Sequence, residues 1–75
     1  MELNDLVKVF DSVLNQDHKA TITSETDFKE SEAWSSLTAF EITAILNDKY
    51  GIKLRGIQIR RCKTIAELYA LIASE

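Results

Sequence analysis

Apolar residues near the start of the chain recur at the spacing of a helix. They lie three or four positions apart and therefore share one stripe of an amphipathic helix. The residues of this stripe are Leu3, Leu6, Val7, Phe10, Val13 and Leu14. The pattern predicts a helix over about residues 2–15.

The helical pattern breaks between Asn15 and Ser35. This stretch is rich in Asn, Asp, Thr, Ser and Glu and offers few apolar side chains to a core, so it predicts a loop. A loop of this length in so short a chain is expected to be functional or to be held down by a few buried residues. We expect Ile22, Phe28 and Trp34 to hold it.

A second helix is predicted to begin at Ser35 and Ser36. Their hydroxyls can accept hydrogen bonds from the free N–H groups of a first helical turn, and an apolar-rich run follows directly over residues 37–46. We expect the helix to end near Tyr50, because Gly51 can adopt the left-handed conformation that closes many helices.

The segment after Gly51 is short and carries two weak signals. Residues 52–54 alternate like a strand but have no partner strand in the sequence, so we interpret them as an ordered loop. Residues 56–63 predict a short helical turn, with Ile57 and Cys62 facing inward and its two arginines facing water.

The last helix is predicted to open at Thr64. Glu67 follows three residues later, which is the reciprocal capping-box spacing. The apolar face behind this start consists of Ile65, Leu68, Tyr69, Leu71 and Ile72. The whole chain therefore predicts an all-α bundle of three principal helices plus one short helix, with a long loop between the first and second helices.

Composition adds that this is an ordinary soluble globular chain rather than a disordered or fibrous one. At 75 residues it is long enough for one compact domain, which we expect to span residues 1–75. No apolar run approaches the roughly 20 residues that span a bilayer, and the N-terminus is too mixed for a signal peptide. We therefore expect a cytoplasmic protein without a membrane partner.

Charge is distributed unevenly along the chain. Residues 1–32, 33–50 and 51–75 carry formal charges of −5, −1 and +3, which together give the net charge of −3. The acidic first part disfavours a nucleic-acid binder, whose basic footprint would normally dominate. The basic turn around Arg60 and Arg61 keeps that function as a minor alternative.

The chain offers few candidates for catalysis. A serine nucleophile needs a base within hydrogen-bond reach, and the single histidine, His18, lies in a polar loop. The single cysteine, Cys62, cannot form an internal disulfide, and its place in an apolar pattern favours a core position over a nucleophile. No Cys and His residues have the spacing of metal ligands, so we expect neither a catalytic residue nor a metal.

Two features of the second helix point instead to binding. Glu41 and Asp48 are seven positions apart, so both can lie on one side of the helix, where a solvated face is the simpler interpretation and a docking face the alternative. Ser36 lies where unpaired N–H groups and the positive end of the helix dipole favour a phosphate ester. From the residues alone, a helix cap is the simpler interpretation of Ser36.

Three segments together resemble an acyl carrier protein, and the resemblance extends over nearly the whole chain: WSSLTAFEI at 34–42, YGIKL at 50–54 and TIAEL at 64–68. In that family the attachment serine stands in an Asp-Ser-Leu motif that opens the second helix. A Glu follows five residues after the serine, and a Phe-Gly-Ile or similar triplet closes the helix. The residues here at those positions are Ser36, Leu37, Glu41 and Tyr50-Gly51-Ile52.

The resemblance implies a carrier with no catalytic activity of its own. A phosphopantetheinyl transferase would esterify Ser36 with the 4′-phosphopantetheine arm of coenzyme A, and the thiol of the arm would hold an acyl group as a thioester. The protein would be a monomer whose partners are this transferase and the acyl-loading and acyl-processing enzymes. The docking residues implied for these partners are Ser35, Leu37, Glu41, Ala44 and Asp48.

The sequence departs from the family pattern in two ways. Ser35 replaces the Asp of the motif, which removes a carboxylate at the start of the helix. The third-helix region is basic where fatty-acid carriers are acidic, which favours a specialised lipid, polyketide-like or aminoacyl pathway; its basic residues are Arg55, Arg60, Arg61 and Lys63. The alternative is an interaction module that keeps the fold and has lost the modification.

Overall fold

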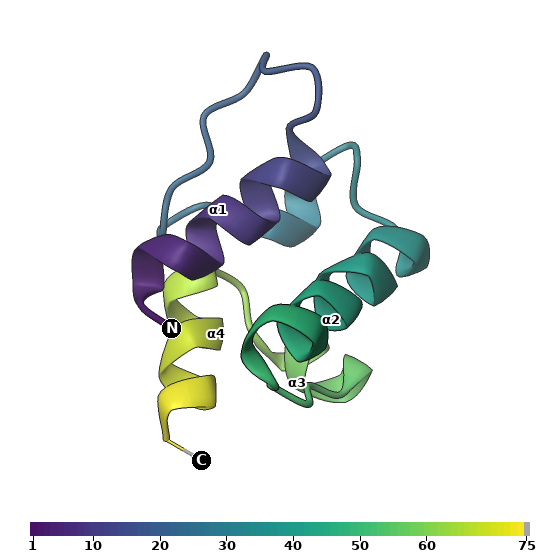
Figure 1. Cartoon of the computed structure of the whole chain (residues 1–75). Coiled ribbons are helices and arrows are strands. Elements are labelled where there is room, and N and C mark those ends of the chain that lie inside the picture. The colour runs from purple at the N-terminus through teal and green to yellow at the C-terminus, as the bar shows by residue number, and fades with distance from the viewer. Residues whose placement is uncertain (75) are drawn as a thin grey trace.

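The computed structural model describes residues 1–74, so that Glu75, the last residue of the predicted domain, lies outside the described residues. Within this range the chain forms four α-helices and one 3-10 turn (Figure 1). Their bounds are α1 Leu3–Leu14, η1 Phe28–Glu30, α2 Ser36–Tyr50, α3 Gly56–Arg61 and α4 Ile65–Ala73. The prediction of an all-α bundle with one short helix is confirmed.

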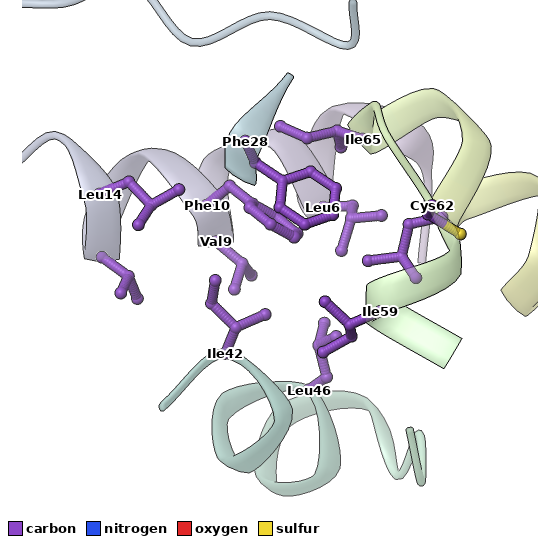
Figure 2. Close-up of a cluster of buried hydrophobic side chains, with 12 residues drawn as sticks. Leu6, Val9, Phe10, Leu14, Phe28, Ile42, Leu46, Ile59, Cys62 and Ile65 are labelled. Carbon is purple, nitrogen blue, oxygen red and sulfur yellow. The ribbon is translucent and has the colours of Figure 1, made fainter. Parts of the chain in front are cut away.

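The core forms where α1, α2 and α4 meet. Helix α1 contacts both α2 and α4, and α3 packs against α2 (Figure 1). Figure 2 shows Phe10 and Phe28 together among side chains that reach in from the other helices. The buried apolar residues are Leu6, Val9, Phe10, Val13, Leu14, Phe28, Ile42, Leu46, Ile59, Cys62, Ile65 and Leu68. Each large one contributes about 1.5–3 kcal/mol through burial.

The long loop is held by the residues expected to hold it. Phe28 is fully buried, with its ring centroid 4.8 Å from that of Phe10 and 5.0 Å from that of Trp34. Ile22 and Trp34 are partly buried against the same core. The 3-10 turn η1 was not predicted, and it serves to aim Phe28 inward.

The same loop is fastened to the junction of α3 and α4. The backbone N–H of Ala66 donates to the carbonyl of Ser24 at 2.9 Å, and the Lys29 ammonium donates to the carbonyl of Arg60 at 2.6 Å. An isolated antiparallel bridge pairs Asp27 with residue 64 nearby. The loop that leads into α2 is therefore fixed to the segment that joins α3 and α4.

The end of α2 follows the prediction. Gly51 adopts the left-handed conformation with φ 68°, and its N–H donates to the Asn47 carbonyl at 3.0 Å. The bond from Gly51 to Asn47 is the 5→1 bond of an αL ending, and the N–H of Ile52 donates to the Leu46 carbonyl at 3.2 Å. Residues 52–54 then form an ordered loop, as expected.

The prediction for α3 was wrong at one residue. Ile57 is 53% exposed, whereas Ile59 is buried at 1% and Cys62, just after the helix, is buried at 6%. Residues two apart are about 200° apart around a helix, so Ile57 and Ile59 cannot both face the core. Residues three apart share a face, so Ile59 and Cys62 point inward together and Ile57 faces outward.

Candidate functional site

The start of α2 is organised by a reciprocal cap between Ser35 and Thr38. The Ser35 hydroxyl accepts a hydrogen bond from the backbone N–H of Thr38 at 3.3 Å. In return, the Thr38 hydroxyl accepts from the Ser35 backbone N–H at 2.8 Å and donates to the Ser35 carbonyl at 2.9 Å. Thr38 thus takes the place that Glu or Gln occupies in the usual capping box.

Ser36 is left without a structural task. It is the first residue of α2 and is exposed, and its hydroxyl makes no hydrogen bond to any residue in the described range 1–74. The prediction that both serines cap the helix was therefore wrong for Ser36. The physical reason is that the N-cap has an extended backbone, here φ −156° and ψ 173° at Ser35, which turns its side chain back toward the first turn, whereas a helical residue directs its side chain outward.

The electrostatics of this helix start favour an anion. Among the described residues, the backbone N–H groups of Ser36 and Leu37 have no hydrogen-bond acceptor. The first turn of α2 contains no acidic residue to neutralise the positive end of the helix dipole. A phosphate bound at such a position gains about 0.3–1 kcal/mol from the dipole.

A groove of about 700 Å³ opens beside Ser36, between the first turns of α2 and the segment around α3. The adjacency of the two helices is visible in Figure 1. The lining is largely apolar, and its polar residues are two serines, one threonine and one arginine. The lining residues are Trp34, Ser35, Ser36, Ala39, Phe40, Thr43, Leu54, Gly56, Ile59 and Arg60.

These features fit a phosphopantetheine arm. An unused hydroxyl is available for a phosphate ester, and the free N–H groups and the helix dipole favour the charge of that ester. The same residue also lines a largely apolar groove of ligand size. Ser36 is the residue that would hold the arm, and the groove would shelter the arm or its cargo.

The residues predicted for partner docking lie along the exposed side of α2. Leu37 is 66% exposed, Ser35, Ala44 and Asp48 are exposed, and Glu41 is half-buried. The steps of four, three and four that separate Leu37, Glu41, Ala44 and Asp48 place these four side chains on one face of the helix.

The alternatives for catalysis find no support in the geometry. His18 lies in the exposed loop after α1 with φ 58° and does not line the groove at Ser36. Burial raises the pKa of the Cys62 thiol, the Glu67 carboxylate raises it further, and the Lys29 ammonium opposes both. A buried thiol with a raised pKa is a poor nucleophile. Within residues 1–74, no group of His, Cys, Asp and Glu side chains is arranged to hold a metal ion.

Several residues of the site were not predicted from the sequence. Phe40 lies one turn after Ser36, and Thr38 lies three residues after Ser35, so helical spacing could have identified both. Leu54, Ile59 and Arg60 reach the groove only because α3 packs against α2, and no local pattern signals that contact.

The comparisons with known proteins agree with this geometry. The model of a protein family described as a phosphopantetheine attachment site matches residues 4–72. No significant match to a curated protein or to a solved structure was found. None of the helices in the described part of the chain combines the length and the apolar character needed to cross a bilayer.

Proposed function

The chain belongs to the phosphopantetheine attachment-site family, and from this premise we propose that Ser36 is the residue that carries the arm. Its cofactor is covalent 4′-phosphopantetheine, and the chain is a carrier protein. We further propose that residues 1–75 form one carrier domain without catalytic activity of its own.

One observation supports Ser36 above all others. The cap of α2 is completed by Ser35 and Thr38, so the Ser36 hydroxyl is free although it stands at the same helix start. A serine that caps a helix stabilises the fold, whereas an unused, exposed hydroxyl that lines a groove is available to an incoming enzyme.

The surrounding residues have distinct tasks in this proposal. The free N–H groups of Ser36 and Leu37 stabilise the negative charge of a phosphodiester on Ser36. Trp34, Phe40 and Leu54 provide an apolar wall that keeps water from the attached chain. When bound, the arm supplies the terminal thiol on which an acyl group is held as a thioester.

The partners follow from the same chemistry. A phosphopantetheinyl transferase must reach the exposed Ser36, and acyl-loading and acyl-processing enzymes must reach the end of the arm. The exposed face that contains Leu37, Ala44 and Asp48 offers them one contact surface. The region around Arg60 and Arg61 is basic where fatty-acid carriers are acidic. This difference supports a role in a specialised lipid, polyketide-like or aminoacyl pathway.

The direct test is intact mass spectrometry after co-expression with a broad-specificity phosphopantetheinyl transferase. The wild type is expected to gain the mass of one phosphopantetheinyl group, and Ser36→Ala is expected to gain none because the acceptor oxygen is gone. Ser35→Ala is the matched control, since it removes the neighbouring hydroxyl and should still be modified.

Two results would contradict the proposal. Modification of Ser36→Ala would place the arm on another residue. An unmodified wild type, in the presence of a transferase that modifies a control carrier, would support the alternative of an interaction module that has lost the arm.

A further inference from the structure

The segment from the end of α2 to the start of α4 has an unusual charge. Residues 49–63 contain six basic side chains and no acidic one, although the whole chain has a net charge of −3. These side chains are Lys49, Lys53, Arg55, Arg60, Arg61 and Lys63. The positive charge of the molecule is therefore concentrated around α3.

Part of this charge lines a hollow that is also lined by two apolar side chains. The hollow measures about 710 Å³ and is separate from the groove at Ser36. We name it the basic hollow, and its lining residues are Lys53, Leu54, Arg55, Ile57, Gln58 and Arg61. Ile57 is 53% exposed within it, so the outward-facing isoleucine of α3 lies among three cations.

These cations are available to a partner. Lys53, Arg55 and Arg61 are exposed, and in the described range 1–74 none of the three forms an ion pair with a carboxylate of the chain. Exposed, unpaired arginines are suited to bidentate contacts with carboxylates.

The basic hollow also adjoins the site of the arm. Leu54 lines both the basic hollow and the groove beside Ser36. A macromolecule seated on the basic hollow is thereby placed next to the residue proposed to carry the cofactor.

We propose that the basic hollow is a docking site for an acidic face of an acyl-processing enzyme. That face inserts an apolar side chain against Ile57 and Leu54 and surrounds it with Asp or Glu carboxylates that meet Lys53, Arg55 and Arg61. The charges determine approach and orientation, and the apolar contact supplies a desolvated centre. The inference rests on the proposed carrier function for the identity of the partner, and on charge and shape for the surface itself.

The lining and shape of the basic hollow favour an acidic protein surface over a nucleic acid or an anionic membrane. A nucleic-acid backbone is bound by phosphate contacts that need no apolar centre, and the −5 charge of residues 1–32 would repel an extended polyanion. A membrane surface is flat, whereas Ile57 lies in a concave site on a helix of six residues.

The test is an NMR titration of the labelled full chain, in its apo and holo forms, with defined probes. The main probe is a capped peptide that places Asp and Glu on both sides of a single leucine. We expect shifts confined to the amides of residues 53–61, and weaker binding as sodium chloride is added. Replacing the leucine by serine, or the acids by Asn and Gln, should weaken binding severalfold.

Variants locate the interaction. Arg55→Glu combined with Arg61→Glu should lower the affinity for the acidic peptide at least about fivefold, which is the upper range for one exposed charge pair. Lys49→Glu combined with Lys63→Glu is the matched control, because it also reverses two positive charges, but outside the basic hollow, and should have a smaller effect. Ile57→Ser tests the apolar centre without altering charge.

Defined outcomes would overturn the inference. They are the absence of shifts in residues 53–61, equal shifts with the neutral peptide, and tighter binding of those residues to duplex DNA or to phosphatidylglycerol vesicles. Shifts that grow with protein concentration alone would assign the basic hollow to a second copy of the chain. The intact mass of the same sample tests the carrier function separately from the docking surface. If the transferase leaves the chain unmodified and the chain still binds the peptide, the carrier function is refuted and the docking surface is retained.

Discussion

The first turns of α2 and α4 are capped in the same way, but the residue that follows each cap has a different environment. In α2, Ser35 and Thr38 exchange hydrogen bonds across the first turn. In α4, Thr64 and Glu67 do the same, with two bonds of 3.2 Å. The next residue differs completely, because Ser36 is exposed whereas Ile65 is 0% exposed.

The difference separates what a fold needs from what a site needs. Both caps satisfy backbone N–H groups that every helix leaves unpaired. In α4 the first helical residue is then used to anchor the helix in the core. In α2 the same position is turned to solvent, and the first turn of the helix contains no acidic residue.

The largest effect on stability is expected at the anchored start. Ile65→Ala should lower the free energy of unfolding by about 2–5 kcal/mol, because it removes methyl groups from a filled core and leaves a cavity. That is a large part of the roughly 4–11 kcal/mol typical of a chain of this size. Urea denaturation followed by circular dichroism measures it, and Ile65→Val provides a milder change if the alanine variant does not fold.

Leu37→Ala is the control in the other helix. It shortens an apolar side chain in the first turn of α2, but that side chain is 66% exposed, so the loss should stay within about 0.5 kcal/mol. A loss equal to that of Ile65→Ala would mean that the start of α2 is also a structural anchor.

An intermediate and similar effect is expected from the two caps. Ser35→Ala and Thr64→Ala each remove the side chain that accepts from the first turn, and each should cost about 0.5–2 kcal/mol. Parallel urea titrations compare the two. If Ser35→Ala has a negligible effect on the free energy of unfolding, Ser36 rather than Ser35 is the residue that caps α2.

The smallest effect on stability is expected at Ser36 itself. Ser36→Ala should change the free energy of unfolding by no more than about 0.5 kcal/mol, because no hydrogen bond within residues 1–74 depends on its hydroxyl. Thermal unfolding beside the Ser35→Ala variant provides the comparison. A destabilisation as large as that of Ser35→Ala would contradict the view that Ser36 is free for modification.

Much of the fold could be predicted because local chemistry marks the helix ends. Gly51 and the pair of Thr64 and Glu67 act through neighbours within a few residues, so spacing alone identifies them. The stripe of α1 was equally clear, and the observed bounds differ from the prediction by one residue at each end.

The remaining features depend on contacts between elements. Ile57 and Ile59 are both apolar and two positions apart, so the sequence does not indicate which of them α3 turns toward α2. Two adjacent serines likewise do not reveal which one has the extended backbone of a cap. The groove and the basic hollow arise only after α3 packs, because Leu54 then lies between them.

Trp34 is the single tryptophan of the chain. It lines the groove beside Ser36 and packs edge to face with Phe28, with the two ring centroids 5.0 Å apart. Trp34 is therefore an intrinsic fluorophore at the place where an attached arm would lie. The emission wavelength and quenching of Trp34 distinguish a groove filled with water from one occupied by an acyl chain, without any label.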